Sequence, residues 1–267
     1  MMPIALFAVA IATTTAGVAA GWVAIGYGAH WRATASGRPK LGKYLRAFGP
    51  EWISTIRTWV GYPSALTPVG PFAPFVPAGG PPIALIHGYM MNRSSMAWIG
   101  KQLRARGYGN VTSLEARPHA ATMEVQADAL AHDIRRWSEH AGGAKVIVVA
   151  HSQGGLLTRV ALSKDPTLPI SGVVTIGSPH AGTVMARVAR TANAKQMRYG
   201  SEFLRDLPKA EVPFVSIYSD LDNIVFPKET SRFGRCVELP GIGHHALCFS
   251  PEVLSAVVEA FSDFRLS

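Results

Sequence analysis

The run Lys145-Val146-Ile147-Val148-Val149-Ala150-His151-Ser152-Gln153-Gly154-Gly155 decides how the rest of the chain is interpreted. Residues 145–150 are mostly apolar and β-branched in the middle, which predicts a buried strand. A helix predicted over 153–162 follows without a gap. Ser152 therefore lies in a tight strand-to-helix turn, where its hydroxyl is pushed out above the sheet and the helix N-terminus offers unpaired N–H groups. Such a crossing of helix and strand needs small residues, which are present as Ala150, Gly154 and Gly155.

Apolar strands alternate with amphipathic helices along the rest of this part of the chain. The pattern predicts further strands at 83–86, 110–114, 172–176, 214–218 and 236–239, and further helices at 95–106, 123–140 and 251–264. Near-continuous apolar strands separated by helices predict an α/β fold, with a mostly parallel sheet covered by helices on both faces. Ligands of such sheets bind beyond the C-terminal strand ends, so the residues that follow strands are the functional candidates.

A serine hydroxyl becomes a strong nucleophile only when a base takes its proton and a carboxylate orients that base. The expected chain order is serine, acid, histidine. Asp220 and Asp222 both follow the strand predicted at 214–218, and His244 and His245 both follow the last strand. Position alone leaves both members of each pair open.

Acyl transfer also needs two hydrogen-bond donors for the oxyanion of the tetrahedral intermediate. The strand at 83–86 ends at His87-Gly88, so the backbone N–H of Tyr89 is one candidate and that of Gln153 is the other. His180 follows the strand at 172–176 and is predicted to line the site and bind substrate. The partly apolar segment 184–207 is predicted to be helical and to cover the site as a small cap.

From about residue 82 to 264 the chain resembles small bacterial lipases and esterases of the α/β-hydrolase superfamily. The matching pieces agree in order and spacing, although Ala150 stands where the usual motif has glycine. They are Leu85-Ile86-His87-Gly88, the run 150–155, Val173-Val174-Thr175-Ile176-Gly177-Ser178-Pro179-His180-Ala181-Gly182, Ile217-Tyr218-Ser219-Asp220-Leu221-Asp222-Asn223-Ile224-Val225 and Gly241-Ile242-Gly243-His244.

The resemblance implies the α/β-hydrolase fold, with Asp222 as the acid and His244 as the base beside Ser152. It also implies a serine hydrolase that cleaves carboxylic esters, of lipids or of other acyl compounds, through an acyl-enzyme. Neither a cofactor nor a metal is expected. The same triad would also serve a thioesterase, an amidase or an acyltransferase. A non-catalytic, membrane-tethered hydrolase-fold protein is a further alternative, against which the three filled triad positions argue.

The distribution of charge and the spacing of the cysteines argue against a nucleic-acid-binding protein and against a cysteine metal site. Although the formal net charge is +9, the basic residues form no stripe with interleaved aromatic side chains, so no nucleic-acid partner is predicted. Cys236 and Cys248 show no metal-site spacing, and a disulfide and two free thiols both stay open. The sequence makes no prediction about the oligomeric state.

The first 31 residues contain no Asp, Glu, Lys or Arg and are long enough to cross a bilayer. They predict a single-pass membrane anchor, with a cleaved signal sequence as the alternative and the side of the membrane left open. Trp22, Tyr27 and Trp31 would then lie at the membrane interface.

Residues 32–81 form a separate stretch in this interpretation. Apolar residues at helical spacing in 41–62 predict an amphipathic helix, which lies on the membrane surface or packs on the hydrolase domain. A Pro/Gly-rich linker follows, so the hydrolase domain is predicted to span 82–267.

Overall fold

The computed structural model describes residues 2–34, 39–65 and 72–264. At its centre is a six-stranded sheet in which every neighbouring pair of strands is parallel, in the order β2-β1-β3-β4-β5-β6. This confirms the predicted parallel α/β sheet. The strands are β1 (Ile83–Ile86), β2 (Val111–Leu114), β3 (Val146–His151), β4 (Ile170–Ile176), β5 (Phe214–Tyr218) and β6 (Arg235–Glu238).

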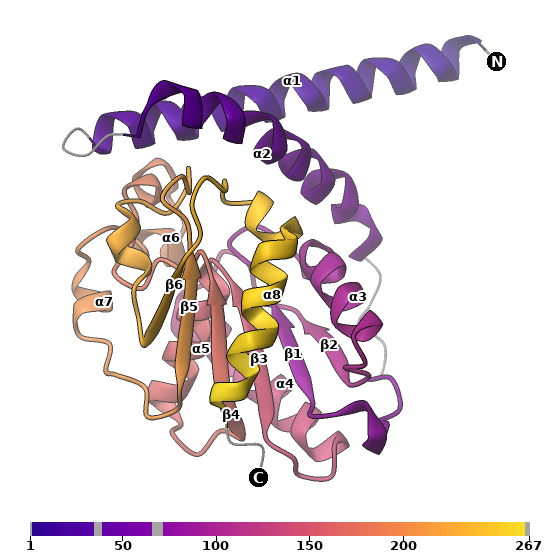
Figure 1. Cartoon of the computed structure of the whole chain (residues 1–267), viewed down its shortest axis with the longest axis vertical. Helices are drawn as coiled ribbons and strands as arrows, with labels where there is room; N and C mark the ends of the chain where they lie inside the picture. The colour runs from indigo at the N-terminus through magenta and orange to yellow at the C-terminus, as the bar shows by residue number, and fades with distance from the viewer. Residues whose placement is uncertain (1, 35–38, 66–71, 265–267) are drawn as a thin grey trace.

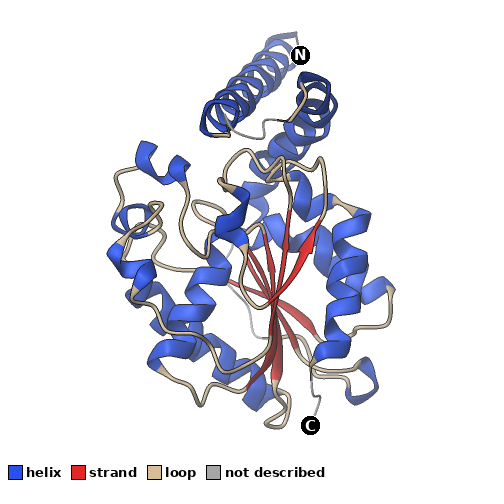
Figure 2. Ribbon diagram, turned by 60° about the vertical axis from the view of Figure 1, so that its left-hand side comes forward, coloured by secondary structure: helices blue, strands red, loops and turns tan. Residues whose placement is uncertain are grey.

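Helices cover both faces of the sheet, as the edge-on view in Figure 2 shows. On one face α4 (Met123–His140) and α5 (Gln153–Lys164) pack in one apolar core with the strands. On the other face α3 (Ala97–Ala105) and α8 (Pro251–Ala260) form the second core. The four inner strands β1, β3, β4 and β5 are buried on both faces and mostly apolar, whereas the edge strands β2 and β6 are only partly covered.

Shorter helical turns connect these elements. Two are the short helices α6 (Ala192–Gln196) and α7 (Glu202–Arg205). The others are 3₁₀ turns at Tyr62–Ala65, Pro77–Gly79, Arg93–Met96, Val184–Val188, Lys228–Ser231, Ala246–Phe249 and Phe261–Asp263.

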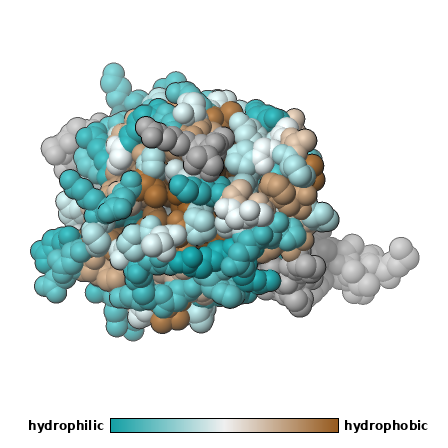
Figure 3. Space-filling view, turned by 90° about the horizontal axis from the view of Figure 1, so that it is seen from below, coloured by the Kyte–Doolittle hydropathy of each residue, from teal (hydrophilic) through white to brown (hydrophobic). Residues whose placement is uncertain are grey.

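Two long helices, α1 (Met2–Ala33) and α2 (Leu41–Gly61), lie across one end of the sheet (Figure 1). This is the end at which β3 leads into Ser152 and β5 leads into Asp222. The opposite end of the molecule, seen in Figure 3, is mostly hydrophilic, with apolar side chains in smaller patches. The functional candidates therefore lie between the sheet and the N-terminal helices.

The prediction of a single-pass membrane anchor was wrong. Although α1 forms, no helix among the described residues is both long and apolar enough to cross a membrane. One face of the second half of α1 packs on protein instead, where Val23, Tyr27 and His30 are buried, while Val18 and Ile25 on this helix are exposed. Tyr27 and Trp31, expected at a membrane interface, pack on the ring of Tyr44 of α2 at centroid distances of 5.6 and 5.4 Å.

Of the two alternatives for the amphipathic segment, the structure shows packing on the hydrolase domain. The buried face of α2 differs from the apolar stripe that the sequence indicates, since Leu45 and Val60 are exposed. The side chains that α2 buries are mainly polar: Tyr44, Ala47, Glu51, Ser54, Thr55 and Thr58. Thr55 and Thr58 bond the carbonyls four residues earlier in α2, whereas the partners of Glu51 are residues 245 and 246, so hydrophobic periodicity could not reveal this face.

The two cysteines are free thiols, Cys236 exposed and Cys248 buried. This decides between the two alternatives that the sequence left open.

Candidate active site

Ser152 has a backbone conformation that L-amino acids rarely adopt. Between the end of β3 and the start of α5 its φ is 53° and its ψ is −124°. Met90, at φ 52°, is the other non-glycine residue with positive φ in the described chain, and both line the same cavity. Strain of this kind persists only where the surroundings enforce it, and it gathers at functional sites.

Close backbone packing holds the turn at Ser152. Its N–H donates to the carbonyl of Ile176 at 2.9 Å. A Cβ on Gly154 would lie 2.8 Å from the carbonyl oxygen of His87, and one on Gly88 would lie 2.9 Å from Cβ of Ser152. The glycines therefore let α5 cross β1 closely, and they bring the backbone of residues 88–89 beside the serine.

The structure brings the predicted acid and base together. Nδ1 of His244 lies 2.8 Å from Oδ2 of Asp222, and both side chains are buried. Oδ1 of Asp222 accepts the backbone N–H groups of Ile224 and Val225 at 2.9 and 2.7 Å. This pairing fixes the imidazole with Nδ1 as the donor, which leaves Nε2 free to act as an acceptor.

Burial shifts the pKa values of Asp222 and His244 in opposite directions. It raises the pKa of Asp222 to about 7, against the opposing effect of the amides of Val225 and Ile224. It lowers the pKa of His244 to about 3, and the nearby positive form of His245 acts in the same direction. The His244 imidazole is therefore neutral at neutral pH, as a general base must be.

Two cavities meet at Ser152. The larger, about 300 Å³, is also lined by His244, Trp59 and Met90. The smaller, about 110 Å³, has mainly apolar walls, to which the segment predicted as a cap contributes Met185, Ala186, Val188, Ala189, Ala194 and Met197. Trp22 of α1 lines both cavities, so the N-terminal helix forms part of their wall.

The two predicted oxyanion residues lie near the serine. Tyr89 lines both cavities, and its hydroxyl lies 2.9 Å from Oγ1 of Thr191. Gln153 is the first residue of α5, so its N–H belongs to the first helical turn, which lacks intrahelical acceptors.

The structure does not bring His180 to these cavities. Pro179 lines the smaller one, whereas the buried ring of His180 stacks on Phe233 at a centroid distance of 5.0 Å. Its Nε2 lies 3.0 Å from Oγ1 of Thr175. The predicted role of His180 in substrate binding has no support in this geometry.

The sequence did not indicate which residues hold the candidate base, His244, in its position. Oδ1 of Asn223 accepts the backbone N–H of His244 at 3.0 Å. The ring of His151 packs on that of His244 with centroids 4.5 Å apart. Glu51 of α2, fully buried, binds the next two residues, His245 and Ala246. One signal was available, since Glu51 is the sole acidic residue between 41 and 61.

One cluster of side chains has the composition of a metal site. Ligand atoms of His87, Glu115 and His119 lie within 4.8 Å of one another. Nε2 of His87 already accepts the N–H of Ala116 at 3.0 Å, and Arg93 lies 3.8 Å from the Glu115 carboxylate. The N–H of Ala116 occupies the His87 nitrogen that a metal would need, and the cluster contributes to neither cavity at Ser152.

Comparison with known proteins agrees with this architecture. Residues 81–211 match the family described as alpha/beta hydrolase fold. Lipase B of Aspergillus fumigatus superposes with a TM-score of 0.65 at 21% identity, over 75% of this chain and 57% of that lipase. The mature lipase BlEst2 of Bacillus licheniformis gives a TM-score of 0.60 at 15% identity, over 72% of this chain and 95% of that one.

The parallel sheet, the serine turn after β3 and the family match together define the class. The chain has the α/β-hydrolase fold: residues 81–211 match the family of that name, and lipases are among its structural neighbours. Because it spans a little over half of the Aspergillus lipase, and at low identity, these neighbours define the fold alone.

Proposed function

We propose that the protein is a serine hydrolase that cleaves carboxylic esters, with Ser152 as nucleophile, His244 as base and Asp222 as the acid that orients it. One observation carries the proposal: a strained serine and a buried imidazole paired with a carboxyl group line the same cavity. Three side chains of these types in this chain order are what a nucleophilic acyl transfer needs.

In this mechanism Oγ of Ser152 attacks the ester carbonyl while Nε2 of His244 takes its proton. The carboxylate of Asp222 stabilises the imidazolium through Nδ1. The backbone N–H groups of Tyr89 and Gln153 are the proposed donors to the oxyanion. Collapse of the intermediate expels the alcohol, which receives the proton from His244. Water then attacks the acyl-enzyme with His244 as base and releases the acid.

The two cavities favour a small acyl group. We assign the acyl chain to the smaller, apolar cavity and the alcohol to the larger one, which His244 also lines. An apolar cavity of about 150 Å³ holds a benzene molecule. A cavity of about 110 Å³ therefore suits a short acyl chain of an ester.

The test is hydrolysis of p-nitrophenyl esters of increasing acyl length by purified protein, with Ser152→Ala as control. We expect hydrolysis of short-chain esters and labelling by a fluorophosphonate probe. The substitution should remove the labelling and lower kcat by about 10⁴-fold or more, because the triad acts as a unit. Hydrolysis that persists in the variant, or a wild-type protein that neither reacts with the probe nor cleaves any ester, would contradict the proposal.

A further inference from the structure

Helix α2 contacts the loop of the candidate base through the carboxylate of Glu51 and, at the longer distance of 3.4 Å, through the hydroxyl of Thr55, which faces Nδ1 of His245. Glu51 is fully buried, and its Oε1 accepts the backbone N–H of His245 at 3.1 Å and lies 3.0 Å from Nδ1 of the same residue. Its Oε2 accepts the N–H of Ala246 at 2.8 Å. These two residues directly follow His244, so the carboxylate binds the backbone beside the base.

The carboxylate also packs against the residue before the base. A Cβ on Gly243 would lie 2.5 Å from Oε2 of Glu51, which leaves room for glycine alone. Together with Asn223, which binds the N–H of His244, Glu51 contacts the chain on both sides of the imidazole.

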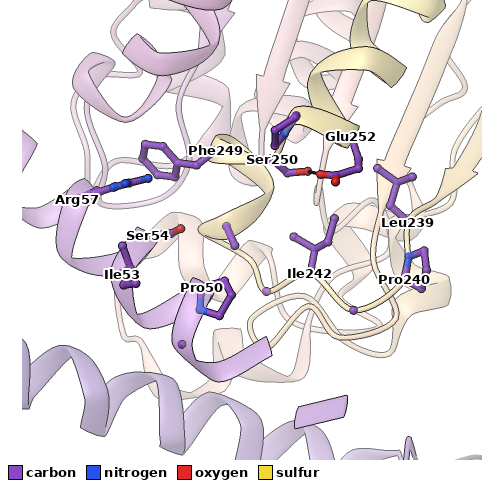
Figure 4. Close-up of a pocket in the computed structure, with 15 residues that line it drawn as sticks. Pro50, Ile53, Ser54, Arg57, Leu239, Pro240, Ile242, Phe249, Ser250 and Glu252 are labelled. Atoms are coloured by element: carbon purple, nitrogen blue, oxygen red, sulfur yellow. Dashed lines mark hydrogen bonds between the residues drawn. The ribbon is translucent and has the colours of Figure 1, made fainter. Parts of the chain in front are cut away.

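Away from Glu51, a groove of about 760 Å³ separates α2 from residues 239–252 (Figure 4). Pro50 and Ile53 of α2 line it on one side, and Leu239 and Ile242 line it on the other. Gly243 and Ala246 reach its edge. Because much of the space between α2 and residues 239–252 is open, the bonds of Glu51 are the main polar link between them.

Glu51 is charged in this setting. Burial raises the pKa of its carboxyl, but the hydrogen bonds from the ring and backbone of His245 and from Ala246 outweigh it, so the pKa is lowered overall. A buried carboxylate is stable only while such donors stay in place. The bonds from His245 and Ala246 are therefore expected to persist whenever α2 is docked.

We propose that Glu51 is a positioning residue for catalysis: by holding the backbone of residues 245 and 246, it fixes the imidazole of His244 against Ser152. This inference rests on the proposed function. It adds a helix outside the matched region 81–211 to the catalytic unit. A displacement of about 1 Å in a reacting group costs about 10²-fold in rate, so a link of this kind matters for kcat.

The test compares Glu51→Gln with Tyr27→Phe. Glutamine has a single acceptor oxygen, so one of the two backbone N–H groups loses its partner. The control removes a hydroxyl from the same interface, 2.7 Å from a Cβ on Gly243, that has no hydrogen-bond partner within the described chain. We expect Glu51→Gln to lower kcat for ester hydrolysis by about 10²-fold with little change in KM. Tyr27→Phe should leave both unchanged.

The pH profile separates positioning from a general loss of stability. Asp222, His151, His245 and Glu51 are the titratable groups that act on His244. The negative charge of Glu51 raises the pKa values of both Asp222 and His244, so its removal should move the acidic limb of kcat/KM to lower pH. An unchanged kcat overturns the proposal, whether or not the acidic limb moves.

Two further measurements test the positioning role of Glu51 if hydrolysis cannot be measured or if Glu51→Gln does not fold. If no Ser152-dependent hydrolysis is found, the downfield NMR signal of the His244 Nδ1 proton still reports the position of the ring. Its loss in Glu51→Gln but not in Tyr27→Phe supports the positioning role, and its persistence in both overturns it. If Glu51→Gln does not fold, Glu51→Asp keeps the charge and both acceptor oxygens but draws them back from the backbone of His245 and Ala246 by one methylene. A fall in kcat of about tenfold then supports the proposal, and an unchanged kcat overturns it.

Discussion

Two carboxylates two residues apart, Asp220 and Asp222, have entirely different surroundings. Asp222 is buried against His244, whereas Asp220 accepts from Lys43 of α2 at 3.2 Å and from the N–H of Gly241 at 2.6 Å. Sequence position allowed either as the acid, and only the resemblance to lipases favoured Asp222. The deciding information is which carboxylate faces the imidazole, which depends on a loop closed by residues far along the chain.

This difference predicts opposite results for two matched substitutions. Asp222→Asn removes the charge that stabilises the imidazolium and favours the wrong imidazole tautomer, so we expect kcat to fall by about 10⁴-fold. Asp220→Asn keeps an acceptor for Gly241 and loses only an ion pair with a half-exposed lysine, which is worth about 1 kcal/mol at most. Steady-state ester hydrolysis measures both. Equal losses in the two variants would refute the assignment of the acid.

At the scale of elements, strands and helices could be predicted from the sequence where the buried residues form a simple, regular pattern along the chain. The mostly apolar runs of β1, β3 and β5 predicted strands within a residue or two, because these strands are buried on both faces. For α1 the predicted membrane anchor was wrong, and for α2 the predicted apolar stripe is not the face that is buried. Hydropathy shows that residues such as Val23 and Tyr27 need to be buried, but it does not show whether lipid or protein buries them.

Helix α1 makes a close contact that one glycine permits. A Cβ on Gly26 would lie 2.8 Å from both Nδ2 and the backbone oxygen of Asn223, whereas one on Gly28 would meet nothing within 4 Å. We expect Gly26→Ala to destabilise the fold by about 1–3 kcal/mol through overpacking and to lower kcat, because Asn223 binds the backbone of His244.

Gly28→Ala, two residues along the same helix, should instead stabilise the fold by up to about 1 kcal/mol through helix propensity. Urea unfolding of the two variants beside the wild type gives both values. If the two changes have the same sign, α1 does not pack on the Asn223 loop as described.

At the scale of the whole molecule, the two N-terminal helices and the sheet share buried contacts. Val23 and Tyr27 of α1, Tyr44 and Ala47 of α2 and Leu221 after β5 form one apolar cluster. Glu51 joins α2 to the loop after β6. The sequence predicted a hydrolase domain starting at residue 82, with the preceding residues outside it. That boundary stays a prediction, but contacts across it are extensive.

These shared contacts predict that α1, α2 and the hydrolase domain unfold together. In urea, the loss of ester hydrolysis and the loss of far-UV circular dichroism should follow one transition with the same midpoint. Loss of activity at clearly lower urea, while the circular dichroism stays native, would show that the N-terminal helices detach as a separate unit.

The bond between Glu51 and His245 also sets an order of events during synthesis. The two residues are 194 positions apart, so Glu51 leaves the ribosome about 10 to 40 s before its partner at ordinary rates of translation. Throughout that interval the carboxylate of Glu51 has none of its final backbone partners. Under the proposed function Ser152 emerges earlier than the proposed base, so activity is expected only when the last strand and the loop after it have closed against the first segments made.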